Sequence, residues 1–301
     1  MTLTLKVDVD TYDGMRDGVP NLLDLFSSLK IRASFFVPFG PDESGKAIFR
    51  VFKKKGFVGK MFRTNALKLY GIKTMLRGTL LPAPPIGGSF PDLARRITDE
   101  GHELGIHGYN HVFWQDHLNE MSDEAVQAEI GRAVSSFETA LRRRPQSFAA
   151  PAWLCTPHSL AANDAQNFDY ASDTRGQSPF FPVMNGHTYR TLQIPSTLPT
   201  LDELLGLDGL TPQNVGAHLD RVMNNRKLEH EVHSVHTEVE GTALFDSFSK
   251  WIRSRYETGT AFVTLSEIAA KEKSHAASVP HCEVKLQTIP GRAGPVACQI
   301  V

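Results

Sequence analysis

Two aspartates near the start of the chain are the first residues that could do chemistry. Residues 4–14, TLKVDVDTYDG, are typical of an apolar strand that ends at Asp8 and Asp10. Side chains two positions apart lie on the same face of a strand, so both carboxylates point the same way. Two like charges this close repel each other and are costly to bury without a partner. The stretch therefore predicts a bound cation.

The motif HGYNH, residues 107–111, supplies further ligands for such a cation. Histidines four positions apart lie on one face of a turn and can bind one metal ion, although each motif alone is a weak signal. Together, Asp10, His107 and His111 form a set of two imidazoles and one carboxylate. Such a set leaves a coordination position for water, which is typical of a catalytic metal site. Zinc, cobalt, manganese and iron all suit these ligands, so the metal stays undetermined.

The remaining polar residues suggest an acid–base pair for hydrolysis. Asp8 is predicted to be the general base, because a carboxylate beside the metal site can take a proton from water. His236, at the end of HEVHSVH, is predicted to be the general acid that protonates the leaving group. Asp173 is predicted to orient and charge His236, as carboxylates do for catalytic histidines.

Three further residues are expected around this pair. Arg175 is predicted to steady Asp8 or to bind substrate, and a local ion pair with Asp173 is the alternative. Trp153 and Tyr109 are expected to line the substrate pocket. A tryptophan in the protein core is a nearly equal alternative for Trp153.

Alternating strand and helix patterns must position these residues. The sequence predicts helices at 18–30, 121–143, 212–227 and 242–257, and strands at 3–9, 33–40, 102–107, 147–151, 168–173, 191–195, 230–236 and 260–265. This order predicts an α/β fold with parallel strands, either an open barrel or a doubly wound sheet, with its site at the carboxyl ends of the strands. The candidate residues at or just beyond such ends are Asp8, Asp10, His107, Asp173 and His236.

The composition excludes several classes of protein. The 301 residues are 41% apolar and 22% charged, and the formal net charge of −1 gives no indication of nucleic-acid binding. Three scattered cysteines without a CxxC pair favour neither a disulfide scaffold nor a cysteine zinc site, and fit a reducing cytosol. No signal peptide and no apolar run long enough to span a membrane is recognised.

One segment, residues 44–91, interrupts the main domain, which is predicted to span 1–270. It has no acidic residue and ten basic ones, interleaved with apolar residues near helical spacing. A cationic amphipathic insertion of this kind is typical of a segment that lies on an anionic membrane surface, and a basic helical hairpin packed on the barrel is the alternative. The residues expected at the membrane surface are Lys53, Lys54, Lys55, Lys60 and Arg63. Residues 271–301 are expected to form an irregular tail.

These motifs resemble the polysaccharide deacetylase (NodB-homology) family of carbohydrate esterases. The resemblance implies a distorted (β/α) barrel and assigns roles to six residues: Asp8 as base, Asp10, His107 and His111 as metal ligands, and His236 as acid with Asp173 as its partner. The family's third motif usually places an arginine before a proline, where this chain has FAAPAW at 148–153. The arginine that would tune the base is therefore absent there, and Arg175 is the candidate to replace it.

A closer resemblance connects the chain to one group of deformylases. VDVDTYDGMRDGVPNLL, the basic insertion, NALKLYG, SDTRG, QIPSTLPTLDE and VHTEVEG are similar to stretches of enzymes that act on undecaprenyl-phosphate-linked 4-deoxy-4-formamido-L-arabinose. The resemblance implies a metal-dependent amide hydrolase, peripheral to the cytoplasmic face of the bacterial inner membrane. It also implies a role in the modification of lipid A with aminoarabinose, which confers polymyxin resistance.

Three alternatives are weighed against this interpretation. A deacetylase of peptidoglycan or chitooligosaccharide uses the same chemistry, but most are exported and the basic insertion has no role in them. A non-catalytic glycolipid-binding protein needs neither a general base nor a general acid, and the presence of Asp8 and His236 argues against it. A nucleic-acid-binding protein would need a matching motif, and the sequence has none.

Overall fold

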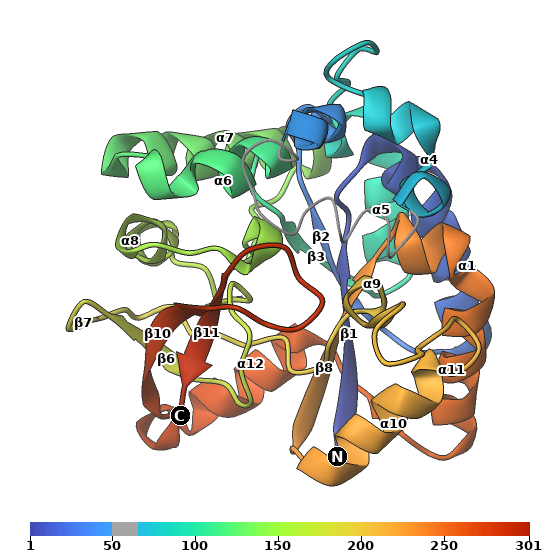
Figure 1. The fold of residues 1–301 in the computed structure, drawn as a ribbon. Helices are drawn as coiled ribbons and strands as arrows, with labels where there is room; N and C mark the ends of the chain where they lie inside the picture. Colours follow the sequence, from blue (N-terminus) through green and yellow to red (C-terminus); the bar gives the residue numbers. More distant parts are fainter. Residues whose placement is uncertain (50–65) are drawn as a thin grey trace.

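The computed structural model describes residues 1–49 and 66–301, and its centre is a curved parallel sheet (Figure 1). The strands follow the order β5-β4-β3-β2-β1-β8, and β9 pairs with the start of β1. Their bounds are β1 Thr2–Asp8, β2 Ser34–Val37, β3 Glu103–Ile106, β4 Ser147–Phe148, β5 Tyr170–Ala171, β8 His230–His236 and β9 Ala261–Phe262. The strands curl into a half-barrel, which confirms the predicted fold class.

The register of the sheet brings the candidate residues to one edge. β1 lies between β2 and β8, and Asp8 is opposite both Phe36 and His236. From Leu3 onward every residue of β1 is buried, as expected for a parallel strand covered on both faces. Since all these strands run in the same direction, their carboxyl ends meet at the edge where Asp8 and His236 end β1 and β8.

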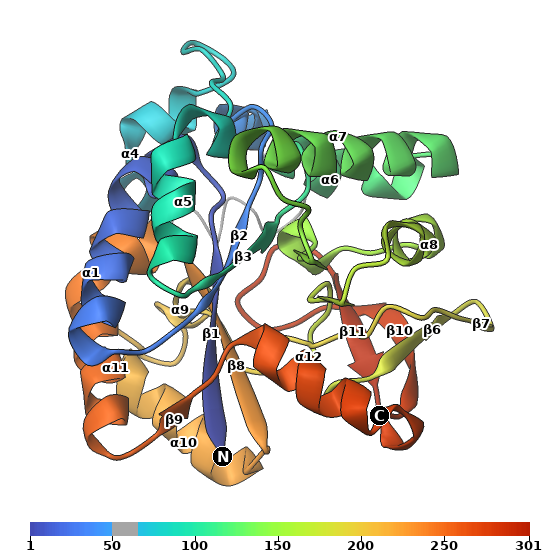
Figure 2. The same ribbon diagram turned by 180° about the vertical axis from the view of Figure 1, so that it is seen from behind.

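Helices cover the sheet and follow the expected βα order. Figures 1 and 2 show α1, α5 and α11 along one side of the sheet, with α6 and α7 beyond the carboxyl end of β3. α1 buries Leu22, Leu23, Leu25 and Phe26 against the main core. The bounds are α1 Val19–Leu29, α4 Ala66–Leu76, α5 Pro91–Asp99, α6 His111–His117, α7 Asp123–Leu141, α8 Pro157–Gln166, α9 Leu201–Leu204, α10 Val215–Arg226, α11 Phe245–Glu257 and α12 Leu265–Ser274.

A second, four-stranded sheet contains the end of the chain. Its order is β11-β10-β6-β7, with bounds β6 Phe181–Met184, β7 His187–Thr188, β10 His281–Gln287 and β11 Val296–Ile300. β10 and β11 form an antiparallel hairpin, and β10 also pairs with β6. The expectation of an irregular tail was therefore wrong. The glycines and prolines at 290–295 belong to the loop of a hairpin.

Two smaller expectations also differ from the structure. The stretch 191–195 forms no named strand, because Gln193 makes only isolated bridges with Ala171 and Phe180. The helix expected from residue 212 begins at Val215, since the Asn214 side chain accepts from the Thr211 N–H and closes a turn before the helix.

Part of the basic insertion lies outside the described residues, including all five residues expected at a membrane surface. In the described part, α4 contains a break at Gly71, whose φ of 76° is not helical. Its C-terminal end is tied to the barrel, because Thr74 and Arg77 both donate hydrogen bonds to Asp13. The amphipathic character of the whole segment stays a prediction.

Candidate metal centre and active site

The three predicted metal ligands lie together at the carboxyl edge of the sheet. Asp10 Oδ1 is 3.3 Å from His107 Nε2 and 3.4 Å from His111 Nε2. One ligand atom from each of the three residues lies within 4.8 Å of the other two. In the described part of the chain, this is the group of His, Cys, Asp and Glu side chains with spacing suited to a metal ion.

The local backbone structure determines the positions of the His107 and His111 imidazoles. His107 directly follows β3, and Gly108 turns the chain with a φ of 69°, a conformation that favours glycine. Asn110 then caps α6, since its side chain accepts from the Phe113 N–H, so His111 is the first residue of that helix. The HGYNH motif thus forms a strand end, a turn and a helix start.

A hydrogen bond fixes the tautomer of His107. Its Nδ1 lies 2.8 Å from the Ala149 carbonyl oxygen, which can only accept, so Nδ1 carries the proton. In the neutral ring, the lone pair of Nε2 then faces Asp10. Backbone carbonyls commonly orient metal-binding histidines in this way.

The electrostatics of Asp10 fit a cation. Burial by itself raises the pKa of this carboxyl, but the imidazoles of His111, His107 and His236 outweigh it and lower the pKa well below its ordinary value. Asp10 is therefore ionised, and its buried Oδ1 has no hydrogen-bond partner among the described residues. Two imidazoles, an ionised carboxylate and an unsatisfied oxygen are a donor set that a divalent metal would complete.

Asp8 has a different partner. The Lys6 ammonium lies 2.5 Å from Asp8 Oδ2, and both side chains are almost completely buried. Asp8 Oδ1 is buried without a hydrogen-bond partner among the described residues. Lys6 also lies near the rings of Trp153 and Phe36, at 5.4 and 5.6 Å from their centroids. The cation beside the predicted base is therefore Lys6, two residues away on the same strand.

Replacing Lys6 with methionine should destabilise the protein by about 3–5 kcal/mol, because it leaves the buried Asp8 carboxylate without its cation. Denaturant unfolding measures the change. The double variant Lys6→Met/Asp8→Asn should regain much of the loss, since the unpaired charge is gone. A double variant as unstable as Lys6→Met alone would contradict the pairing.

The structure corrects the partner of His236. His236 Nδ1 lies 3.6 Å from Asp202 Oδ1, and Asp202 is buried at the start of α9. Asp173 is instead held by the Ala150 N–H and by the side-chain amides of Asn163 and Gln193, at 2.8–2.9 Å. Asp202, not Asp173, is therefore the carboxylate next to the predicted acid, at an ion-pair distance and not at a hydrogen-bond distance.

Asp173 supports the loop that follows β4. This loop provides the Ala149 carbonyl for His107, the Ala150 N–H for Asp173, and Trp153. Ala152 and Trp153 have φ values of 59° and 52°, which are strained for residues with a side chain. Burial raises the pKa of Asp173 to about 6, against the lowering effects of Gln193, Ala150, Lys6 and Asn163. Its contacts fix the loop rather than His236.

Arg175 does not reach Asp8 through any described contact. Its guanidinium donates to both oxygens of Glu203, at 3.0 and 3.1 Å, and to the Leu198 carbonyl. It also lies 4.9 Å from the centroid of the Trp153 ring. The hypothesis that Arg175 replaces the missing arginine finds no contact to support it, because the cation that pairs with Asp8 is Lys6. The alternative of an Arg175–Asp173 ion pair is not seen either, since the carboxylate that Arg175 contacts belongs to Glu203.

Of the two aromatic residues expected to line the pocket, Trp153 is buried and Tyr109 is partly exposed. Trp153 is buried, its indole N–H donates to Ser196 Oγ at 2.8 Å, and its ring meets the His236 ring edge-on with centroids 6.0 Å apart. Tyr109 packs against the core, and the Arg132 guanidinium lies 4.8 Å from its ring centroid. Trp153 therefore supports His236 from within the protein.

Sequence reasoning missed two residues at this site. A signal for Lys6 existed. It lies on the same strand face as Asp8, in a strand whose apolar residues predict burial, and a buried lysine needs an anionic partner. No comparable signal existed for Asp202. It lies 34 positions before His236, and only tertiary packing brings the two together.

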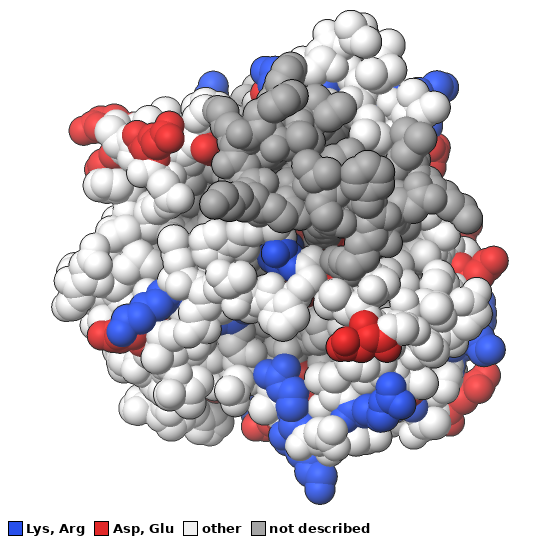
Figure 3. All heavy atoms as spheres, viewed as in Figure 1, with Lys and Arg blue, Asp and Glu red and all other residues white. Residues whose placement is uncertain are grey.

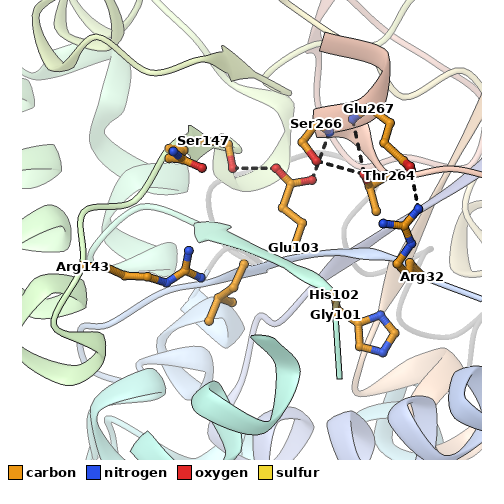
Figure 4. A pocket seen from close by; sticks show the side chains of 11 residues that line it. Arg32, Gly101, His102, Glu103, Arg143, Ser147, Thr264, Ser266 and Glu267 are labelled. Carbon is orange, nitrogen blue, oxygen red and sulfur yellow. Dashed lines mark hydrogen bonds and ion pairs between the residues drawn. The ribbon is translucent and has the colours of Figure 1, made fainter. Parts of the chain in front are cut away.

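A cavity at the opposite end of the sheet is separate from this site. It has a volume of about 220 Å³ and lies at the amino ends of β3 and β4 (Figure 4). Its acidic groups already have partners: Glu103 accepts from Ser147 and Ser266, and Glu267 pairs with Arg32. Nothing in this arrangement resembles the chemistry at the carboxyl edge.

The fold and the site together define a class of protein. The sequence model of the family described as polysaccharide deacetylase matches residues 6–171, and the chain belongs to this family. A probable polysaccharide deacetylase from Pseudomonas aeruginosa PAO1 has the same fold, with a TM-score of 0.61 and 14% identity over 90% of each chain.

Two relatives are more similar in sequence. A protein from Shewanella sediminis named probable 4-deoxy-4-formamido-L-arabinose-phosphoundecaprenol deformylase ArnD is 36% identical over 268 residues, which are 89% of this chain and 86% of that protein. A protein of the same name from Wigglesworthia glossinidia brevipalpis is 30% identical over 287 residues, covering 95% of this chain and 98% of that protein.

Proposed function

We propose that this protein hydrolyses the N-formyl group of undecaprenyl-phosphate-linked 4-deoxy-4-formamido-L-arabinose, a step in the modification of lipid A with aminoarabinose that leads to polymyxin resistance. The names and coverage of the two relatives support this substrate. The observation that carries the chemistry is the placement of a second, separate carboxylate beside the ligand triad. Asp8 lies two residues before Asp10 and opposite His236 in the sheet.

The residues of the site have complementary tasks in amide hydrolysis. A divalent metal held by Asp10, His107 and His111 would polarise the amide carbonyl and acidify the attacking water. Asp8 takes the proton from that water through its Oδ1, while Lys6 holds the other oxygen. His236 gives a proton to the departing amine, and Asp202 keeps its ring oriented. The products are formate and the free amino sugar on its lipid carrier.

An assay of formate release tests this function. The purified protein should release formate from the lipid-linked formamido sugar and should lose that activity with a chelator. The N-acetyl analogue and chitooligosaccharides serve as competing substrates. Equal or faster release of acetate would favour a general deacetylase, and binding without release of either acid would favour a glycolipid-binding protein.

Attachment to an anionic inner-membrane surface is part of the proposal. Three observations support it: the excess of basic residues in 44–91, the lipid carrier named for the relatives, and the exposure of apolar side chains in the described part of the segment. Ile72 is 62% exposed and Leu80 is 82% exposed. No helix among the described residues has the length and apolar character to cross a bilayer. In Figure 3, the described part of one face mixes Lys and Arg with Asp and Glu.

Changing Lys53, Lys54 and Lys55 to glutamate should weaken binding to anionic liposomes at least about 100-fold, because each cation near such a surface contributes about 1 kcal/mol. Cosedimentation measures the binding, and metal content should not change. The matched control is the triple change of Arg142, Arg143 and Arg144 to glutamate at the end of α7. Equal binding by both variants, or binding that high salt does not weaken, would contradict the surface contact.

A further inference from the structure

The hairpin at the end of the chain reaches the active site. Figures 1 and 2 show the loop between β10 and β11 extending from the second sheet to the side of α9. Gly291 is pressed so closely against α9 that a Cβ at this position would lie 2.0 Å from the Glu203 carbonyl oxygen. The loop is therefore in firm contact with the helix that carries Asp202.

Backbone and apolar contacts hold this hairpin in place. The Arg175 N–H donates to the Ala297 carbonyl, and the Gln299 N–H donates to the Arg175 carbonyl. Val296 and Cys298 pack with Trp153 in a small apolar cluster, against which Ile289 also lies. The position of the loop is thus set by the same tryptophan that meets the ring of His236.

The loop brings Arg292 against Trp153, the residue whose ring also meets His236. Its guanidinium lies 4.5 Å from the centroid of the Trp153 ring, and its side chain is 12% exposed. In the described part of the chain, this side chain donates to Glu203 alone, at 3.5 Å. A guanidinium has five N–H donors, so most of its capacity is available to a ligand.

The positive charges around Glu203 outnumber its single negative charge. Glu203 is the shared carboxylate, and Arg175 already contacts both of its oxygens, while the Thr200 N–H donates to Oε2. Two guanidinium groups therefore share one carboxylate, and the one at the longer distance belongs to Arg292. A partly buried, incompletely paired arginine beside a catalytic site is suited to an anion.

We propose that Arg292 binds the phosphodiester that links the sugar of the substrate to its lipid carrier. This inference rests on the proposed function and names the group that recognises the carrier end of the substrate. The formamide at C4 and the phosphate at C1 lie on opposite sides of a pyranose ring, so the phosphate must lie one sugar ring away from the reacting carbonyl. Trp153 spans the space between His236 and Arg292. The C-terminal hairpin is then a specificity element for phosphate-linked sugars.

The test compares two substrates with one variant. For a prenyl-phosphate-linked formamido sugar, Arg292→Gln should lower kcat/KM about 10- to 100-fold, mainly through KM, because it removes a charge-assisted hydrogen bond. For the methyl glycoside of the same formamido sugar, which has no phosphate, kcat/KM should stay within about twofold. Arg292→Lys should recover part of the loss. Arg143→Gln, at the far end of the sheet, is the matched control and should leave both substrates unaffected.

Calorimetric titration with farnesyl phosphate provides a readout independent of turnover. The unmodified protein should bind this probe and Arg292→Gln should bind it at least about tenfold more weakly, with unchanged metal content. Equal losses on both substrates would indicate a merely structural role and overturn the proposal, as would equal binding of the probe by both proteins. If the unmodified protein binds the probe but releases no formate, the proposed function fails and the phosphate site stands.

Discussion

Replacing Asp8 with asparagine should lower kcat for formate release by about 10²- to 10⁴-fold, which is the usual contribution of a positioned general base. Asparagine has nearly the same shape and can still accept a hydrogen bond from Lys6, but its side chain takes up no proton at neutral pH. Because Asp8 is not one of the three ligand residues, bound metal and KM should change little.

The measurement combines steady-state kinetics with elemental analysis of the purified variant. Asp92→Asn is a suitable control, because the Asp92 side chain is almost fully exposed at the start of α5. A variant Asp8→Asn that keeps its metal and nearly its full rate would rule out Asp8 as the base.

Changing His107 to alanine should remove the bound metal and reduce activity on the order of 10³-fold or more. Polarisation of the carbonyl and activation of water contribute several kcal/mol to such reactions, and each 1.4 kcal/mol corresponds to a factor of ten. His111→Ala should behave in the same way, since both imidazoles face Asp10. His236→Ala should differ from both: activity falls, and the metal remains.

A chelator provides the same test without any substitution. Activity should disappear when the metal is removed and return when a divalent ion is added. His117→Ala, on the exposed end of α6, is the control and should keep both metal and activity. Full metal occupancy in His107→Ala or His111→Ala would show that the ligand set is wrong.

The ligand triad could be predicted because its geometry is local. A spacing of four across a turn places His107 and His111 on one side, and both follow from the printed sequence. Asp10 follows β1 by two residues, and the parallel sheet brings it to the same edge as the two histidines. The parallel sheet then needs only the alternation of strands and helices, which these segments show clearly. β8 begins and ends at the predicted residues, His230 and His236.

The parts of the site that could not be predicted depend on contacts between residues far apart in the sequence. Asp202 and Glu203 lie on a four-residue helix whose sequence gives no sign that it faces His236 or Arg175. Asp173 was assigned to His236 because carboxylates commonly orient catalytic histidines, and the family resemblance implied the same pairing. Its amide partners Asn163 and Gln193 become neighbours only in the folded chain. β10 was missed although its sequence, HCEVKLQ, alternates apolar Cys282, Val284 and Leu286 with polar residues, which is the pattern of a strand.

The pairing of Lys6 with Asp8 affects which segments of this enzyme can be exchanged without disturbing the orientation of the base. Both residues belong to one central strand, so the orientation of the base depends on no loop. The groups expected to recognise the rest of the substrate, in contrast, sit on connections around the rim. Substrate preference can therefore be re-engineered by exchanging rim segments, while the Lys6–Asp8 pair on the central strand stays intact.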